Sequence, residues 1–197
     1  MKISKKLILL FIAILFCVII YFAISIYAKY LTTTNGNTQM KIANWNISVN
    51  NLSIKNNTDI SDTIVPVFPG NDNIAKDIIA PTAEGYFDLN FDFTGADVSF
   101  TYNITTSVAE ESSVKDLVAT GYSIDDGTKI NFKNYNDPIT DTILLNDNIN
   151  TRKIRIYVMW NYDETTAKMT NEEDTQATKS DNPALFHVNI SFTQIAE

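Results

Sequence analysis

The residues most suited to chemistry in this sequence are the carboxylates of one polar run between residues 163 and 181. Asp163, Glu173, Asp174 and Asp181 belong to this run. Calcium binds about six to eight oxygen ligands, and loops rich in Asp, Glu and Asn supply them. Calcium is therefore the one cofactor that the sequence suggests, with these four side chains as its candidate ligands.

A second interpretation of the same run is a solvated connection between two strands. The segment "NEEDTQATKSDN" lacks the ordered Asp-x-Asp-x-Asp-Gly spacing of the helix-loop-helix calcium sites. It also lies beside or contains Lys168 and Lys179, whose positive charges oppose cation binding. We favour the connection and retain calcium as the alternative.

Residues for catalysis are scarce. His187 is the one histidine, and Cys17, the one cysteine, lies in an apolar segment near the start of the chain. A zinc site needs several N or S ligands, and neither HExxH nor GxSxG occurs. Asp88 and Asp92 share one strand face but give no aromatic-lined pair of the kind that glycoside hydrolysis uses. We predict no catalytic or cofactor-binding residues and no enzymatic activity.

The first 28 residues have the pattern of an export leader. Three lysines precede an apolar stretch from residue 7 to residue 27, and Ala28 is a small residue at a cleavage position before Lys29. This predicts a signal peptide cut between Ala28 and Lys29. Because about 20 apolar residues also suffice to span a bilayer, a retained membrane anchor is the alternative. Both interpretations place the rest of the chain outside the cytoplasm, in the extracellular space or at the cell surface.

The net charge argues against two classes of partner. Residues 29–197 retain 12 of the 15 basic residues and all 23 acidic ones, which gives a formal net charge of −11. Such a surface repels nucleic acid and anionic membranes. The same residues contain no cysteine, so a packed core and not a disulfide must hold them together.

Beyond a polar linker at residues 29–40, hydrophobicity alternates with a period of two, which is typical of half-buried strands. The clearest runs are "IANWNISV", "GYFDLNFDF", "VSFTYNIT", "KIRIYVMWNY" and "LFHVNISFTQ". The second and third flank "TGAD" around Gly95, and this pattern predicts a β-hairpin. Weaker strands are expected at residues 52–54, 63–68, 118–124, 129–132 and 139–145, and a short helical turn at residues 112–117.

Strands with one apolar face need a second sheet to cover that face. We therefore predict one domain at residues 41–197, an all-β antiparallel β-sandwich of the jelly-roll or Ig-like kind. It follows the hydrophobic signal or anchor helix at residues 1–28 and the linker at residues 29–40.

The order of these segments resembles the TasA/camelysin-like exported proteins of Gram-positive bacteria. The resemblance runs through the leader, "KIANWNISVN", "IIAPTAEGYFDLNFDFTGADVSFTYNIT", "VATGYSIDDG", "IRIYVMWNYDE" and the final "SFTQ". It covers most of the chain. In "APTAEG", Thr82 stands where a glycine often follows the proline in that family.

The resemblance implies a jelly-roll-like sandwich released by a dedicated signal peptidase, with a structural role at the cell surface or in the biofilm matrix. It implies other matrix proteins or further copies of the chain as partners, and fibre formation by donation of an N-terminal strand. Before cleavage, the leader would contact the membrane. A membrane-anchored surface binding module or adhesin is the alternative function.

Overall fold

The computed structural model describes residues 14–22, 44–54, 59–163, 165–180 and 182–195. The chain divides into two compact units, residues 1–42 and residues 43–197. In the first unit, residues 14–22 form an α-helix. Among the helices that the structure describes, none has the length and hydrophobicity needed to cross a bilayer. The predicted cleavage site at Ala28 and Lys29 and the linker at residues 29–40 lie outside the described residues.

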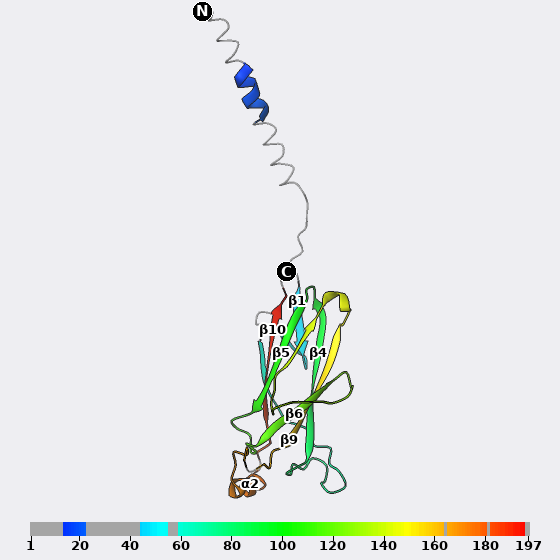
Figure 1. The fold of residues 1–197 in the computed structure, drawn as a ribbon, viewed down its shortest axis with the longest axis vertical. Helices are drawn as coiled ribbons and strands as arrows, with labels where there is room; N and C mark the ends of the chain where they lie inside the picture. Colours follow the sequence, from blue (N-terminus) through cyan, green and yellow to red (C-terminus); the bar gives the residue numbers. More distant parts are fainter. Residues whose placement is uncertain (1–13, 23–43, 55–58, 164, 181, 196–197) are drawn as a thin grey trace, which may run out of the picture. The chain divides into compact units, whose positions relative to one another are not determined.

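The second unit is an all-β sandwich of two antiparallel sheets (Figure 1). The first sheet has six strands, in the spatial order β2 (Leu52–Ile54), β1 (Trp45–Val49), β4 (Glu84–Ala96), β9 (Thr151–Trp160), β6 (Leu117–Ile124) and β7 (Ile130–Asn131). The second sheet has four strands, in the order β3 (Asp59–Ile64), β10 (Phe186–Gln194), β5 (Phe100–Val108) and β8 (Ile139–Ile143). Two short helices complete the unit, η1 (Leu145–Asp147) and α2 (Asn171–Ala177).

Alternation along the strands builds the core between the sheets. Strand β10 buries every second residue from Phe186 to Phe192, and β9 does so from Ile154 to Trp160. Aromatic rings from opposite sheets then pack on each other, with ring centroids 5.1 Å apart for Phe93 and Phe100. Burial of apolar surface is the main favourable term in folding. This core can therefore hold the domain together without a disulfide, as expected from the sequence.

The predicted hairpin is wrong, although both of its strands exist. Strand β4 lies in the six-stranded sheet and β5 in the four-stranded sheet, so the two strands are not paired. The chain crosses between the layers after Ala96, and Phe91 of β4 stacks on Tyr102 of β5 at 5.4 Å. A hairpin and a crossover both place alternating apolar residues on buried faces, so the pattern alone does not distinguish them.

Other boundaries differ in detail. The strand expected at residues 63–68 is β3, which ends at Ile64 before Pro66, a residue that has no N–H for a ladder. Residues 112–117, where a helical turn was expected, are not helical, and the turn closed by the N–H of Ser112 on the carbonyl of Ala109 at 3.1 Å comes just before them. Within the acidic run, helix α2 was not expected.

Candidate functional site

Residues 161–185, called here the acidic connection, join β9 to β10. It lies at the end of the sandwich where α2 is labelled in Figure 1. Three of the four predicted calcium ligands are in its described part, and Asp181 lies outside the described residues. The geometry of these three side chains, and of the residues that hold the connection, decides what this part of the molecule can do.

Asp163 and Glu173 bind groups of their own loop. The Oδ1 atom of Asp163 accepts hydrogen bonds from the backbone N (2.9 Å) and hydroxyl (2.7 Å) of Thr165. Glu173 accepts from the backbone N of Thr170 at 2.7 Å, and the hydroxyl of Thr170 accepts from the Glu173 N–H at 3.3 Å. This reciprocal pair is a capping box that begins α2. The hydrogen bonds from Thr165 and Thr170 lower the pKa of Asp163 and of Glu173 respectively.

Asp174 lies in a different environment. Partial burial raises the pKa of its carboxyl group, and the negative charges of Asp116 and Glu173 raise it further, while a hydrogen bond from Trp160 opposes this rise. A carboxyl group beside like charges favours its neutral form. A bound cation would reverse this preference, because it would offset the repulsion between Asp174 and Asp116.

Asp116, just before β6, is the anchor of the connection and was not identified from the sequence. Its side chain is buried (3% exposed) and accepts hydrogen bonds from the backbone N of Lys168 at 2.5 Å and of Met169 at 2.8 Å. Its carbonyl accepts the N–H of Asn161 at 2.8 Å. One buried residue therefore satisfies backbone donors on both sides of the 161–169 loop.

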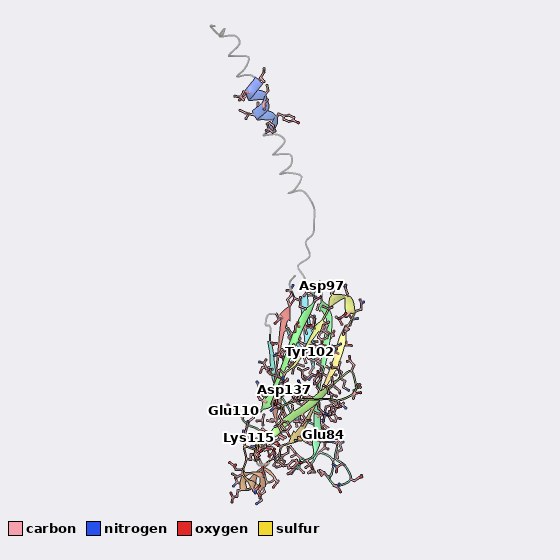
Figure 2. The ribbon with its side chains drawn as sticks, viewed as in Figure 1. Glu84, Asp97, Tyr102, Glu110, Lys115 and Asp137 are labelled. Atoms are coloured by element: carbon pink, nitrogen blue, oxygen red, sulfur yellow. The ribbon has the colours of Figure 1, made fainter. Side chains whose placement is uncertain are left out.

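Ser112 holds the other end of the connection. It is 3% exposed, and its hydroxyl donates to the carbonyl of Val114 at 2.8 Å and accepts the N–H of Leu185 at 3.0 Å. The N–H of Ala109 bonds to the carbonyl of Leu185 at 3.0 Å. Figure 2 shows Glu110 and Lys115, from the same segment, close together at this end of the unit, and the Lys115 ammonium bonds to the Glu110 carbonyl. The acidic connection is thus a loop that two buried polar residues, Asp116 and Ser112, hold in place through hydrogen bonds.

In the part of the chain that the structure describes, no three His, Cys, Asp or Glu side chains gather in a way that could hold a metal ion. Asp163 and Glu173 accept hydrogen bonds from backbone donors of their own turns, and the negative charges of Asp116 and Glu173 repel that of Asp174. Calcium binding by Asp163, Glu173, Asp174 and Asp181 therefore stays a prediction, and it requires these local hydrogen bonds to rearrange.

Two other parts of the molecule contain residue types that are used in catalysis. The exposed His187 bonds through Nε2 to the hydroxyl of Ser61 on β3 at 3.1 Å, which is the one hydrogen bond of its imidazole ring with the described residues. A serine and a histidine alone lack the third group that orients the imidazole in a triad. The pair also lies on the outer surface of a sheet, where no cleft encloses it.

The second place is the outer face of the six-stranded sheet. Arg155 binds both oxygens of Asp88, at 2.7 and 2.8 Å, and this hydrogen bonding lowers the pKa of Asp88. The Asp92 carboxylate accepts the N–H and hydroxyl of Thr94, and its pKa is lowered as well. A glycosidase needs one carboxyl group with a raised pKa as its acid. This pair supplies none.

Aromatic rings on this outer face are covered by cations. The guanidinium of Arg155 lies 3.9 Å from the ring centre of Tyr86, and the ammonium of Lys129 lies 4.7 Å from that of Tyr157. Lys129 also bonds to Glu84, the first residue of β4. Figure 2 labels Glu84 near the end of the unit where the acidic connection lies. Each ring therefore has one face engaged in a cation–π contact within the fold.

No protein-family model matches the chain, and no curated protein matches it either.

Proposed function

We propose that the chain is an exported, non-enzymatic structural protein of the cell surface or biofilm matrix, with the jelly-roll-like sandwich of the TasA/camelysin-like proteins. The leader pattern at residues 1–28 supports export, with the cut between Ala28 and Lys29. The cysteine-free sandwich supports a role that needs a stable folded body.

The turn before β4 supports the resemblance. The N–H of Ala83 bonds to the carbonyl of Ala80 at 3.0 Å, Pro81 stands at the second position and Thr82 has a φ of 73° at the third. A type II turn has proline at the second position and needs a positive φ at the third, where glycine is the favoured residue. Thr82 thus occupies the backbone conformation that a proline-glycine pair would adopt.

The observation that carries the proposal of assembly is the free side of β3. This six-residue strand ends the four-stranded sheet and pairs, among the described residues, with β10 alone. The other sheet edges are shorter, with five residues in β8, three in β2 and two in β7. An unpaired edge is the surface to which a further strand adds.

This edge is partly protected. The Asp62 side chain accepts the N–H of Thr63 at 2.8 Å, so an added strand would have to displace that carboxylate to use the donor. We propose that residues 29–40 of a neighbouring copy provide the added strand. Such an edge favours regulated assembly over indiscriminate pairing.

The test is negative-stain microscopy of residues 29–197, with and without calcium. Filaments that disappear when residues 29–40 are deleted are the expected result. If filaments of the wild type require calcium and filaments of Asp174→Asn do not, the result would support the cation site. A uniform monomer in every condition would contradict fibre formation and favour the alternative, a membrane-anchored surface binding module.

A further inference from the structure

Met169 and Asp116 join two segments that are far apart in the sequence. The Met169 Sδ atom accepts the N–H of Lys115 at 3.0 Å, and the Met169 N–H donates to the Asp116 carboxylate at 2.8 Å. The same carboxylate accepts the N–H of Lys168 at 2.5 Å. Each pair of neighbouring residues therefore uses one side chain to bind a backbone donor of the other pair. We call Lys115, Asp116, Lys168 and Met169 the methionine clasp.

The methionine clasp holds the first half of the acidic connection. Met169 lies directly before Thr170, the N-cap of α2, and its partly buried side chain packs against the core. Ser112 holds the other end of the connection through the N–H of Leu185. Release of the clasp would therefore free the loop before α2 from the turn before β6, while the connection stays attached at Leu185.

The thioether of Met169 is the group in the clasp that is open to oxidation. A thioether sulfur is a weak hydrogen-bond acceptor and is the atom of methionine that oxidants attack. Met169 is partly exposed, so a small oxidant can approach its side chain from solvent. Hydrogen peroxide transfers one oxygen atom to a sulfur lone pair. The O–O bond breaks, an S–O bond forms, the sulfur is oxidised by two electrons, and the remaining oxygen leaves as water.

We propose that oxidation of Met169 to its sulfoxide by hydrogen peroxide opens the methionine clasp and releases the loop before α2. An oxygen on the side of Lys115 enters the 3.0 Å gap between sulfur and nitrogen. Since an N–H donor stays about 2.9 Å from an oxygen acceptor, the sulfur must then move away from Lys115. An oxygen on the other side places a polar group against the core that Met169 contacts, and burial of an unpartnered polar group is unfavourable.

This inference goes beyond the proposed function and does not depend on it, because it concerns a covalent change within one copy of the chain. Residues 43–197 contain no cysteine, so oxidation of methionine is the sulfur chemistry available to them. Reductases convert methionine sulfoxide back to methionine, which makes the change reversible. Met169 is thus a modification site whose two states differ in how the acidic connection is held.

The experiment uses residues 43–197, a compact unit with its own core, whose two methionines are Met159 and Met169. Mass spectrometry of peptides measures the oxidised fraction at each methionine after treatment with hydrogen peroxide, and hydrogen exchange is compared before and after. Oxidation of Met169 should speed exchange at the amides of Lys115, Lys168 and Met169 by about tenfold or more, because these donors lose their partners. The amides of β10 should keep their protection.

Three variants separate the effect of Met169 from that of Met159, which lies on the outer face of β9 opposite Glu84 and Val118. Met159→Leu should respond to peroxide as the wild type does. Met169→Leu keeps an apolar side chain of similar volume, so exchange at Lys168 and at residue 169 should be the same with and without peroxide. Met169→Gln places a polar group at the same site and should open the clasp without peroxide.

Oxidised Met169 with unchanged exchange at Lys168 would overturn the proposal. Equal acceleration by peroxide in Met169→Leu would also overturn it, because the cause would then be another group. The same holds if Met169 resists peroxide until β10 loses its protection, since the clasp would then open only when the whole unit unfolds. Methionine sulfoxide reductases should restore slow exchange in the oxidised wild type, and fast exchange that persists after Met169 is reduced would contradict a reversible clasp.

Discussion

Arg152 of β9 and Asp141 of β8 form an ion pair between the two sheets. The guanidinium Nη1 atom binds Asp141 Oδ2, and the Tyr102 hydroxyl donates to the same oxygen at 3.4 Å. Arg152 Nε also lies 3.7 Å from Asp125 Oδ2. The Arg152 side chain is 13% exposed and that of Asp141 is 39% exposed, so water screens the pair on one side only. The link ties β9 of one layer to β5 and β8 of the other.

Replacing Arg152 should weaken this link. We expect Arg152→Met to lower the free energy of unfolding by about 1–2 kcal/mol, less than for a fully buried pair, because Asp141 remains partly hydrated. Urea unfolding followed by tryptophan fluorescence measures the change. A double-mutant cycle with Asp141→Asn isolates the coupling between the two side chains.

The control is Asp126→Asn, which removes an ion pair with Lys153 at a side chain that is 69% exposed. We expect it to change stability by less than about 0.5 kcal/mol. Equal losses in Arg152→Met and Asp126→Asn would contradict a special role for the link between the sheets.

Tyr102 makes the stability of the protein sensitive to alkali. Burial raises its pKa from 10.0 to about 12, against the opposing hydrogen bond of Arg152. The folded state therefore holds this proton when the unfolded chain has released it, so stability falls as pH rises from about 10 to 12. We expect this part of the alkaline loss to be absent in Tyr102→Phe. Unfolding measured at several pH values checks this, and identical slopes for both proteins would refute it.

Asp116 is expected to control the order of the acidic connection. Asparagine keeps one acceptor but turns an amide group towards a backbone donor of Lys168 or Met169. We expect Asp116→Asn to cost about 1–3 kcal/mol, the range for a buried group that loses its partner. Hydrogen exchange at the Lys168 and Met169 amides should accelerate. Asp163→Asn, at an exposed turn, is the matched control and should leave these two amides protected.

Thr82 offers a gain in stability. A β-branched residue with a φ of 73° is strained, whereas glycine adopts this conformation freely. We expect Thr82→Gly to raise the free energy of unfolding by about 0.5–1 kcal/mol after the larger entropy of the unfolded glycine is counted. Thr82→Val keeps the branched shape and should give no gain. A loss of stability in Thr82→Gly would show that the turn does not strain the threonine.

Much of the fold was readable from the sequence. The alternation in β9 and β10 predicted which residues are buried, from Ile154 to Trp160 and from Phe186 to Phe192, because side chains in a strand point to opposite faces in turn. The same rule placed His187 on the outer face of β10. The requirement for a second layer followed, since an apolar face of this size must be covered.

The tertiary structure decided which strands are neighbours. A period of two determines the face to which each side chain points but not the partner of each strand. For this reason β4 and β5 have the sequence pattern of a hairpin although they belong to different sheets. The anchors of the acidic connection also depend on contacts between distant segments, because Asp116 meets Lys168 and Met169 across 52 and 53 residues of sequence. The sequence by itself determined the alternation of residues 41–197, the absence of cysteine from them and the apolar stretch at residues 7–27. Only folding determined the pairing of the strands and the ion pair of Arg152 with Asp141, because both depend on contacts between distant segments that local patterns do not encode.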